Sequence, residues 1–195
     1  MSRTPSTTPA VPPVTDDPWR EWRAATPARI ALGRAGAGMP TAETLRFGWA
    51  HAMARDAIHA ALDIDELDRQ LRDQGWPCLH VRSRAEDRTA YLRRPDLGRR
   101  LDAGDDARLR AAAAPGGGCD VCIVIGDGLS SLAVERHAAP LLGALRPHMP
   151  PALRFSPVVV ATQARVALAD EVAEAFGAAL AVMLIGERPG LSSPD

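Results

Sequence analysis

The sequence of 195 residues contains no lysine, and all 23 of its basic residues are arginine. Alanine and glycine are abundant as well, so we attribute this bias to a GC-rich genome rather than to a function. Acidic and basic residues nearly balance, giving a net charge of −1 at pH 7. The charge therefore gives no reason to expect nucleic acid or an anionic membrane as a partner.

Cysteines and long apolar runs are also scarce. Three cysteines cannot form a complete set of disulfides, which suits a reducing compartment. The longest apolar run, Ala178 to Ile185, is far shorter than the roughly 20 residues that cross a bilayer. No charged segment followed by an apolar core marks a signal peptide at the N-terminus. We therefore expect a soluble, cytoplasmic protein with no membrane partner.

Familiar catalytic patterns are missing too. There is no G-x-S-x-G or Walker A sequence, which argues against a hydrolase or nucleotidase. The glycine-rich stretch 33–38 resembles a dinucleotide loop, but no strong strand precedes it. Cys119 and Cys122 form a CxxC, yet within a strand they would point to opposite faces, so we expect no metal site. His51 and His59 lie about 12 Å apart along one helix, too far to share an ion.

The N-terminal part divides into a tail and a mainly helical region. Residues 1–27 are rich in Ser, Thr and Pro and are expected to form a flexible tail. Within the tail, Asp17 and Pro18 followed by Trp19 and Trp22 predict a short helix that docks on another surface. Residues 28–114 are expected to be mainly helical, with one short strand.

Within this region, a glycine-containing loop at 28–40 precedes a long helix capped by Thr41. The i+4 spacing of apolar residues predicts a buried stripe on that helix. Its members are Leu45, Trp49, Met53 and Ala57. A second helix from Asp63 to Gly75, a strand at 78–81 and short helices around Pro95 and Gly98 are expected to follow.

Residues 115–195 have the alternating pattern of a parallel sheet. Pro115 to Gly118 marks the clearest boundary in the chain. Three apolar strands are predicted at 121–125, 157–160 and 180–185, with helices at 130–146 and 168–176 between them. We predict an α/β fold, a Rossmann-like parallel βαβαβ unit preceded by a helical N-terminal region.

Glycines and polar residues follow each predicted strand directly, at 126–130, 163–166 and 186–190. Each segment alone could be an ordinary tight turn. In an open parallel sheet, however, ligands bind outside the carboxyl ends of the strands, so three such segments on one edge favour a binding site.

The segment 91–101, YLRRPDLGRRL, holds four arginines in its first ten residues. One interpretation is a solvated face. The other is a surface that contacts carboxylates or phosphates of a partner or cofactor, because arginine pairs with both in a bidentate manner. The residue types alone do not decide between the two.

Four stretches together resemble the small subunit of ethanolamine ammonia-lyase. They are residues 28–36 with 41–47, then 91–101, 126–130 and 186–190, and the resemblance spans roughly residues 28–193. It implies a subunit that binds adenosylcobalamin together with a large TIM-barrel subunit, in a hetero-oligomer that deaminates ethanolamine to acetaldehyde and ammonia by radical chemistry.

The same resemblance places cobalamin contacts on Val166 and Glu187. Asp127 and Gly128, at the same strand edge, are further candidate cofactor-binding residues. The radical chemistry belongs to the partner, so no residue here is expected to be catalytic.

Family members continue past residue 195 with several dozen residues, including a cysteine that contacts the cofactor. We therefore expect either a fragment or a shortened relative. The alternative function is a non-catalytic assembly partner of the large subunit that has lost cobalamin; a stand-alone nucleotide-binding module is less favoured. Association with a bacterial microcompartment is left open, because the N-terminal tail is short.

Overall fold

The computed structural model describes residues 14–113 and 118–190. The chain divides into two units, residues 1–52 and 53–195, which are considered separately. The first half of the predicted tail and most of the boundary at 115–118 lie outside the described residues. The predicted limits at residues 27 and 114 therefore stay predictions.

In the first unit, the predicted short helix is present as a 3-10 helix, η1 (Arg20–Ala25). Asp17 precedes it and accepts a hydrogen bond from the backbone N–H of Trp19 at 2.9 Å. Trp19 and Trp22 are 63% and 51% exposed, so docking of this helix on another surface stays a prediction. The loop after it is held by a β-bridge between Thr15 and Arg34.

The long helix is confirmed as α1 (Thr41–His59). Its start differs by one position from the prediction. The carbonyl of Pro40 accepts hydrogen bonds from the N–H groups of Glu43 and Thr44, so Pro40 precedes the first turn and Thr41 lies inside the helix.

The predicted buried stripe of α1 is wrong over most of its length. Leu45 and Trp49 are 68% and 71% exposed, and Met53 is also exposed. Only Ala57 of the predicted set is buried. The buried apolar side chains of α1 are alanines instead, Ala50, Ala54 and Ala57. Apolar residues occur on more than one side of this helix, so their spacing could not select the buried side.

Most of the remaining elements lie where the sequence predicted them, but α4 (Ala103–Ala112) and η3 (Arg146–His148) were not predicted as separate elements. In chain order, the remaining elements are α2 (Ile64–Asp73), β1 (Cys78–Arg82), α3 (Arg88–Arg93), η2 (Leu97–Arg99), α4 (Ala103–Ala112), β2 (Val121–Gly126), α5 (Ser131–Leu145), η3 (Arg146–His148), β3 (Val158–Thr162), α6 (Leu168–Phe176) and β4 (Leu180–Ile185). Ser130 caps α5 by accepting from the N–H of Ala133 at 3.2 Å. Gly177 ends α6 with φ +59°. Among the described helices, none combines the length and the apolar character needed to span a bilayer.

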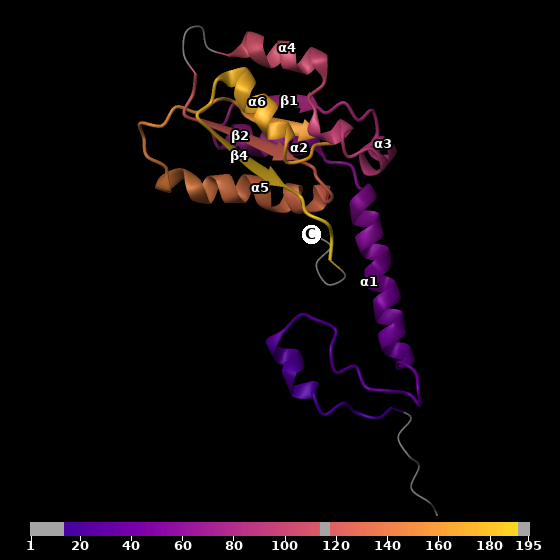
Figure 1. Ribbon diagram of the computed structural model, residues 1–195. Coiled ribbons are helices and arrows are strands. Elements are labelled where there is room, and N and C mark those ends of the chain that lie inside the picture. The colour runs from indigo at the N-terminus through magenta and orange to yellow at the C-terminus, as the bar shows by residue number, and fades with distance from the viewer. Residues whose placement is uncertain (1–13, 114–117, 191–195) are drawn as a thin grey trace, which may run out of the picture. The chain divides into compact units, whose positions relative to one another are not determined.

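The second unit is built on a parallel sheet with strand order β1-β3-β2-β4 (Figure 1). The α/β prediction and its βαβαβ unit, β2-α5-β3-α6-β4, are confirmed. The sheet has four described strands rather than three, because β1 pairs with β3 from Cys78–Val158 to Arg82–Thr162. Residues 78–81 were predicted as a strand, but their weak alternation gave no sign that this strand joins the sheet.

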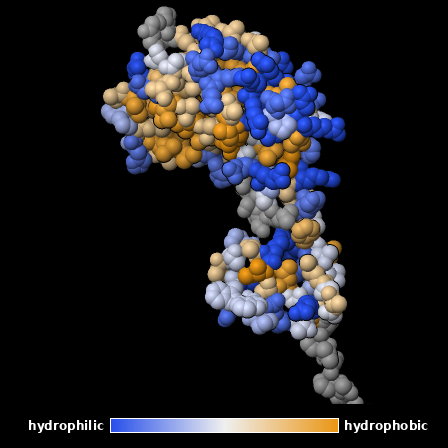
Figure 2. Space-filling model, viewed as in Figure 1, coloured by the Kyte–Doolittle hydropathy of each residue, from blue (hydrophilic) through white to orange (hydrophobic). Residues whose placement is uncertain are grey.

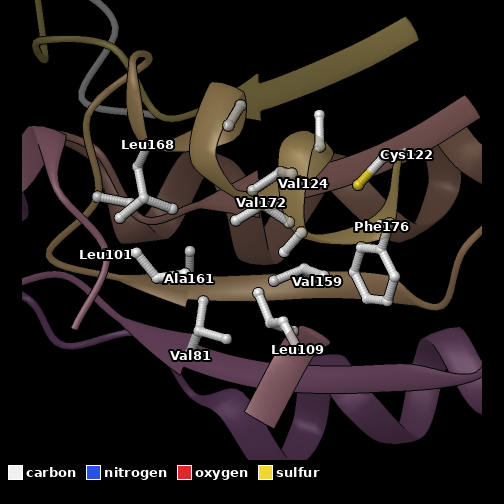
Figure 3. Packing of buried hydrophobic residues seen from close by; sticks show 14 residues of the cluster. Val81, Leu101, Leu109, Cys122, Val124, Val159, Ala161, Leu168, Val172 and Phe176 are labelled. Atoms are coloured by element: carbon white, nitrogen blue, oxygen red, sulfur yellow. The ribbon is translucent and has the colours of Figure 1, made fainter. Parts of the chain in front are cut away.

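Two apolar clusters cover the two faces of the sheet. Side chains alternate along β2, so Cys122 and Val124 face one cluster while Ile123 and Ile125 face the other. The first cluster is closed by α4 and α6 and includes Leu109, Leu168, Val172 and Phe176 (Figure 3). The second is closed by α2 and α5 and includes Leu67, Leu71, Val134 and Leu142. The helices after β2 and β3 therefore lie on opposite faces, as in a doubly wound fold.

Apolar side chains are visible on the surface of this unit where β4 and α5 lie (Figure 2). Leu141, Leu145 and Leu180 are each at least 39% exposed. Within the described residues β4 is an edge strand, since it pairs only with β2.

Candidate functional site

The strand order reverses between β2 and β4. The chain leaves β2 for β3 on one side and then returns to β4 on the other side of β2. Crevices outside the carboxyl ends of such neighbouring strands are where open α/β sheets bind ligands. A cavity of about 230 Å³ lies at this point. It is lined by Tyr91, Gly128, Leu129, Arg165, Val166, Ile185, Gly186, Glu187 and Arg188.

Three of the four predicted cofactor-binding residues line this cavity: Gly128, Val166 and Glu187. They come from the loops after β2, β3 and β4. Val166 is 62% exposed and Glu187 is also exposed, so both side chains are available to a ligand. The structure thus brings together residues that are up to 59 positions apart in the sequence.

Two glycines bring the loops after β2 and β4 into backbone contact. Gly128 has φ +55°, and a β-carbon on it would overlap the carbonyl of Gly186. That carbonyl accepts a hydrogen bond from the N–H of Leu129 at 2.7 Å. A side chain at residue 128 would therefore separate the two loops that form this side of the cavity.

Asp127 lies behind the cavity rather than in its lining. Asp127 is only 3% exposed. Its carboxylate accepts hydrogen bonds from the backbone N–H groups of Gln163 and Ala164 at 2.9 and 3.0 Å. Gln163 has φ +52°, a left-handed conformation that is unfavourable for a residue with a side chain. Burial raises the pKa of Asp127, while these amides and the Arg88 guanidinium act to lower it. The carboxylate thus holds the loop that carries Val166.

The arginine-rich segment has a third role that neither interpretation anticipated. Its first residue, Tyr91, is 1% exposed and donates a hydrogen bond from its hydroxyl to the carbonyl of Ala164 at 3.1 Å. Arg165, in the same loop as Ala164, also contacts Tyr91. Its Nη2 donates to the carbonyl of Tyr91 at 3.1 Å, and its guanidinium lies 4.7 Å from the Tyr91 ring centre. The backbone N–H of Arg165 donates a hydrogen bond to the carbonyl oxygen of Gly98 at 2.8 Å. The segment therefore supports the loop after β3.

Gly98 is confined by the same contacts. A β-carbon there would lie 3.0 Å from Cδ2 of Tyr91 and 3.1 Å from the carbonyl oxygen of Gln163. Two of the segment's four arginines pair with carboxylates outside the cavity lining. Arg94 pairs with Asp96 at 2.8 Å and Arg100 with Glu171 at 2.5 Å.

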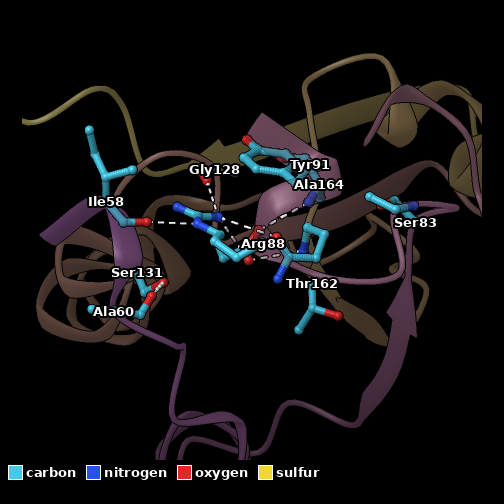
Figure 4. A network of polar contacts seen from close by, with 12 residues as sticks. Ile58, Ala60, Ser83, Arg88, Tyr91, Gly128, Ser131, Thr162 and Ala164 are labelled. Atoms are coloured by element: carbon cyan, nitrogen blue, oxygen red, sulfur yellow. Dashed lines mark hydrogen bonds and ion pairs between the residues drawn. The ribbon is translucent and has the colours of Figure 1, made fainter. Parts of the chain in front are cut away.

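Arg88 is the residue that sequence reasoning missed. Its guanidinium lies among four segments in a network of polar contacts (Figure 4). Nε donates to the carbonyl of Ile58 at 2.7 Å, and Nη1 donates to the carbonyl of Gly128 at 2.8 Å. Nη1 also lies 3.6 Å from the carboxylate of Asp127. A single arginine within an arginine-rich region carries no recognisable signal, so only the fold reveals this position.

Cys119 and Cys122 pack against the same apolar cluster. The reason given for excluding a shared metal was wrong, because Cys119 precedes β2 and packs against the same cluster as Cys122. In the part of the chain that the structure describes, no group of three or more His, Cys, Asp or Glu side chains could hold a metal ion.

Comparison with known proteins decides the family. The family model for ethanolamine ammonia-lyase light chain (EutC) matches residues 16–195. The ethanolamine ammonia-lyase small subunit of Azotobacter vinelandii is 54% identical over 185 residues, which cover 94% of this chain and 68% of that protein. The small subunit of Ralstonia nicotianae is 53% identical, with 93% of this chain and 68% of that protein covered.

The chain belongs to the ethanolamine ammonia-lyase light chain family. The resemblance drawn from four short stretches is confirmed over nearly the whole chain. The family match includes every loop that lines the cavity, together with Arg88, Tyr91 and Asp127 behind it.

Proposed function

We propose that the chain is a small subunit of an ethanolamine ammonia-lyase, and that the cavity between β2 and β4 contacts adenosylcobalamin. The observation that supports this most is the position of the cavity. It lies at the reversal of strand order in a protein of this family, and three residues nominated from the sequence line it.

The lining fits a group with this chemistry. Cobalamin offers an apolar ring edge with methyl groups and flexible amide side chains. The cavity offers apolar contacts from Leu129, Val166 and Ile185, and hydrogen-bonding groups from Glu187 and Arg188. Its volume of about 230 Å³ is smaller than a typical pocket for a whole drug-sized ligand, roughly 300 Å³ or more. It would therefore take one edge of the cofactor, and the large subunit would cover the rest.

When bound, the cofactor supplies a radical by cleavage of its Co–C bond. The residues of this chain would bind the cofactor and orient it. Val166 and Leu129 would provide apolar surface that excludes water. The Glu187 carboxylate would accept hydrogen bonds from the side-chain amides of the cofactor. Asp127 acts from behind the cavity by holding the Gln163–Ala164 backbone. We assign no residue here to catalysis.

Reconstitution tests this proposal. The chain is co-expressed with an ethanolamine ammonia-lyase large subunit, and acetaldehyde formation is measured with and without adenosylcobalamin. We expect activity only when both subunits and the cofactor are present. Full activity of the large subunit alone would contradict the proposal.

The second candidate function is a non-catalytic partner that binds the large subunit without cofactor. The small volume of the cavity is the observation in its favour. A stable complex whose corrin absorption does not change on addition of a cobalamin would support this alternative.

A further inference from the structure

Most contacts of Arg88 go to segments that line or support the cavity, while its Nε donates to the carbonyl of Ile58 at the end of α1. Gly128 lines the cavity and accepts from Nη1 at 2.8 Å. Tyr91 also lines it, with its ring centre 4.8 Å from the Arg88 guanidinium. Arg88 itself does not line the cavity and belongs to neither apolar cluster.

The chemistry of this position requires a guanidinium. Its Nε and Nη1 donate in different directions, to the end of α1 and to the loop after β2, while its flat face lies over an aromatic ring. An ammonium group has neither the flat face nor the separated donors. The Arg88 side chain is only 15% exposed, and Asp127 beside it is only 5% exposed, so their charges lie away from bulk water.

Arg88 acts on the loop after β3 through a long direct hydrogen bond, from Nη1 to the side-chain Oε1 of Gln163 at 3.5 Å, and through two intermediates. The first is Asp127, whose carboxylate lies 3.6 Å from Nη1 and accepts from the amides of Gln163 and Ala164. The second is Tyr91, whose ring lies against Arg88 and whose hydroxyl donates to Ala164. Val166, an expected cofactor contact, is two residues beyond Ala164.

We propose that Arg88 is a positioning residue of the cofactor site, which holds the loop after β2 through Gly128 and the loop after β3 through Gln163, Asp127 and Tyr91. Arg88 fixes the spacing between Gly128 on one side of the cavity and Val166 on the other. This inference rests on the proposed cobalamin site and adds a residue that the family resemblance did not nominate.

Two substitutions on the same helix test the inference. Arg88→Met keeps an unbranched apolar stem and removes the guanidinium. Arg93→Met is the matched control, because the Arg93 side chain is exposed and makes no ion pair or hydrogen bond with another described residue. Leu67→Ala, in the cluster under α2, controls for a general loss of stability, since Leu67 is 1% exposed and distant in sequence from every cavity residue.

The first readout is amide hydrogen exchange of the chain without cofactor. We expect Arg88→Met to speed exchange at Gln163 and Ala164 by about tenfold or more, because Asp127 loses its charged neighbour. Arg93→Met should leave these two amides unchanged. Unchanged exchange at both amides in Arg88→Met would overturn the inference, and this result does not depend on whether cobalamin binds.

The second readout is titration of the complex with the large subunit, using hydroxocobalamin and the corrin absorption. We expect Arg88→Met to weaken the affinity about tenfold, Arg88→Lys to recover only part of it, and Leu67→Ala to bind like wild type despite a lower Tm. Wild-type affinity in Arg88→Met, or a loss of affinity that follows Tm across all variants, would overturn the inference. Absence of binding by the wild-type complex would instead contradict the proposed function, leaving the exchange result to decide the role of Arg88 in the loops.

Discussion

The backbones of Gly128 and Gly186 lie so close together that a β-carbon on Gly128 would overlap the carbonyl of Gly186. This contact joins the loop after β2 to the loop after β4, on one side of the candidate site. A left-handed φ of +55° at Gly128 adds a second reason for glycine.

Gly128→Ala should therefore destabilise the protein more than a left-handed glycine elsewhere. The matched control is Gly177→Ala, since Gly177 has φ +59° and, among the described residues, a β-carbon there would meet only Gly118 Cα at an ordinary 3.4 Å. We expect the control to cost about 1–2 kcal/mol of unfolding free energy, from backbone strain alone. Gly128→Ala should cost clearly more, because the loops must also move apart. Equal losses in urea unfolding would contradict the close approach of the two loops.

Glu187→Ala should weaken cobalamin binding while leaving folding nearly intact. Glu187 is exposed and forms no ion pair or hydrogen bond with another described residue, so its removal should change the unfolding free energy by no more than about 0.5 kcal/mol. Thermal melting and cofactor titration of the complex measure the two effects. A large drop in Tm together with unaltered affinity would mark Glu187 as a structural residue.

Much of this arrangement follows from the sequence. Each strand of the βαβαβ unit is a short apolar run, and each helix has a recognisable end, such as Ser130 before α5 or Gly177 after α6. Because parallel strands place their carboxyl ends at one edge, the apolar runs alone are enough to group the loops that contain Gly128, Val166 and Glu187.

Other features depend on contacts between distant segments. Nothing local in Cys78–Arg82 indicates that it pairs with β3. The exposed Leu45 and Trp49 show that an apolar i+4 pattern does not say which side of a helix is covered. Likewise, Asp127 was nominated as a cofactor contact from its position after a strand. Its carboxylate instead binds backbone amides of another loop, and a direct contact with cobalamin stays a prediction.

Tyr91→Phe should reveal the contribution of the hydrogen bond to Ala164. The ring and its stacking with Arg88 and Arg165 are retained, while the carbonyl of Ala164 loses its hydroxyl partner. We expect a loss of about 1 kcal/mol in unfolding free energy. Urea unfolding at neutral pH measures it. A variant as stable as the wild type would show that the Tyr91 hydroxyl does not hold the loop.

Cys119 should react with an alkylating reagent before the other two cysteines do. Cys78 and Cys122 are buried, and burial raises the pKa of both thiols, that of Cys78 to about 11. Only Cys119 is partly accessible. Iodoacetamide at pH 8 should therefore label Cys119 first in the native protein and all three after denaturation, as mass spectrometry would show. Early labelling of Cys78 would contradict its buried position.

The raised pKa of Cys78 also makes stability depend on pH. The folded protein holds this proton more tightly than the unfolded chain, whose thiol has an ordinary pKa near 9. The free energy of unfolding should therefore fall as the pH rises from about 9 to about 11. Urea unfolding across this range checks the direction, with Cys78→Ser as the control in which this component is absent. A steady rise in wild-type stability relative to that control would contradict the assignment.

The most direct test of the cofactor site is a titration of the complex between this chain and an ethanolamine ammonia-lyase large subunit with hydroxocobalamin. Two samples are compared, one with the wild-type chain and one with Val166→Asp, which places a charge on the exposed apolar surface beside the cavity. The account predicts a saturable change in corrin absorption with the wild-type chain and at least tenfold weaker binding with the variant. Identical binding curves for the two complexes, or no change in either, would contradict it.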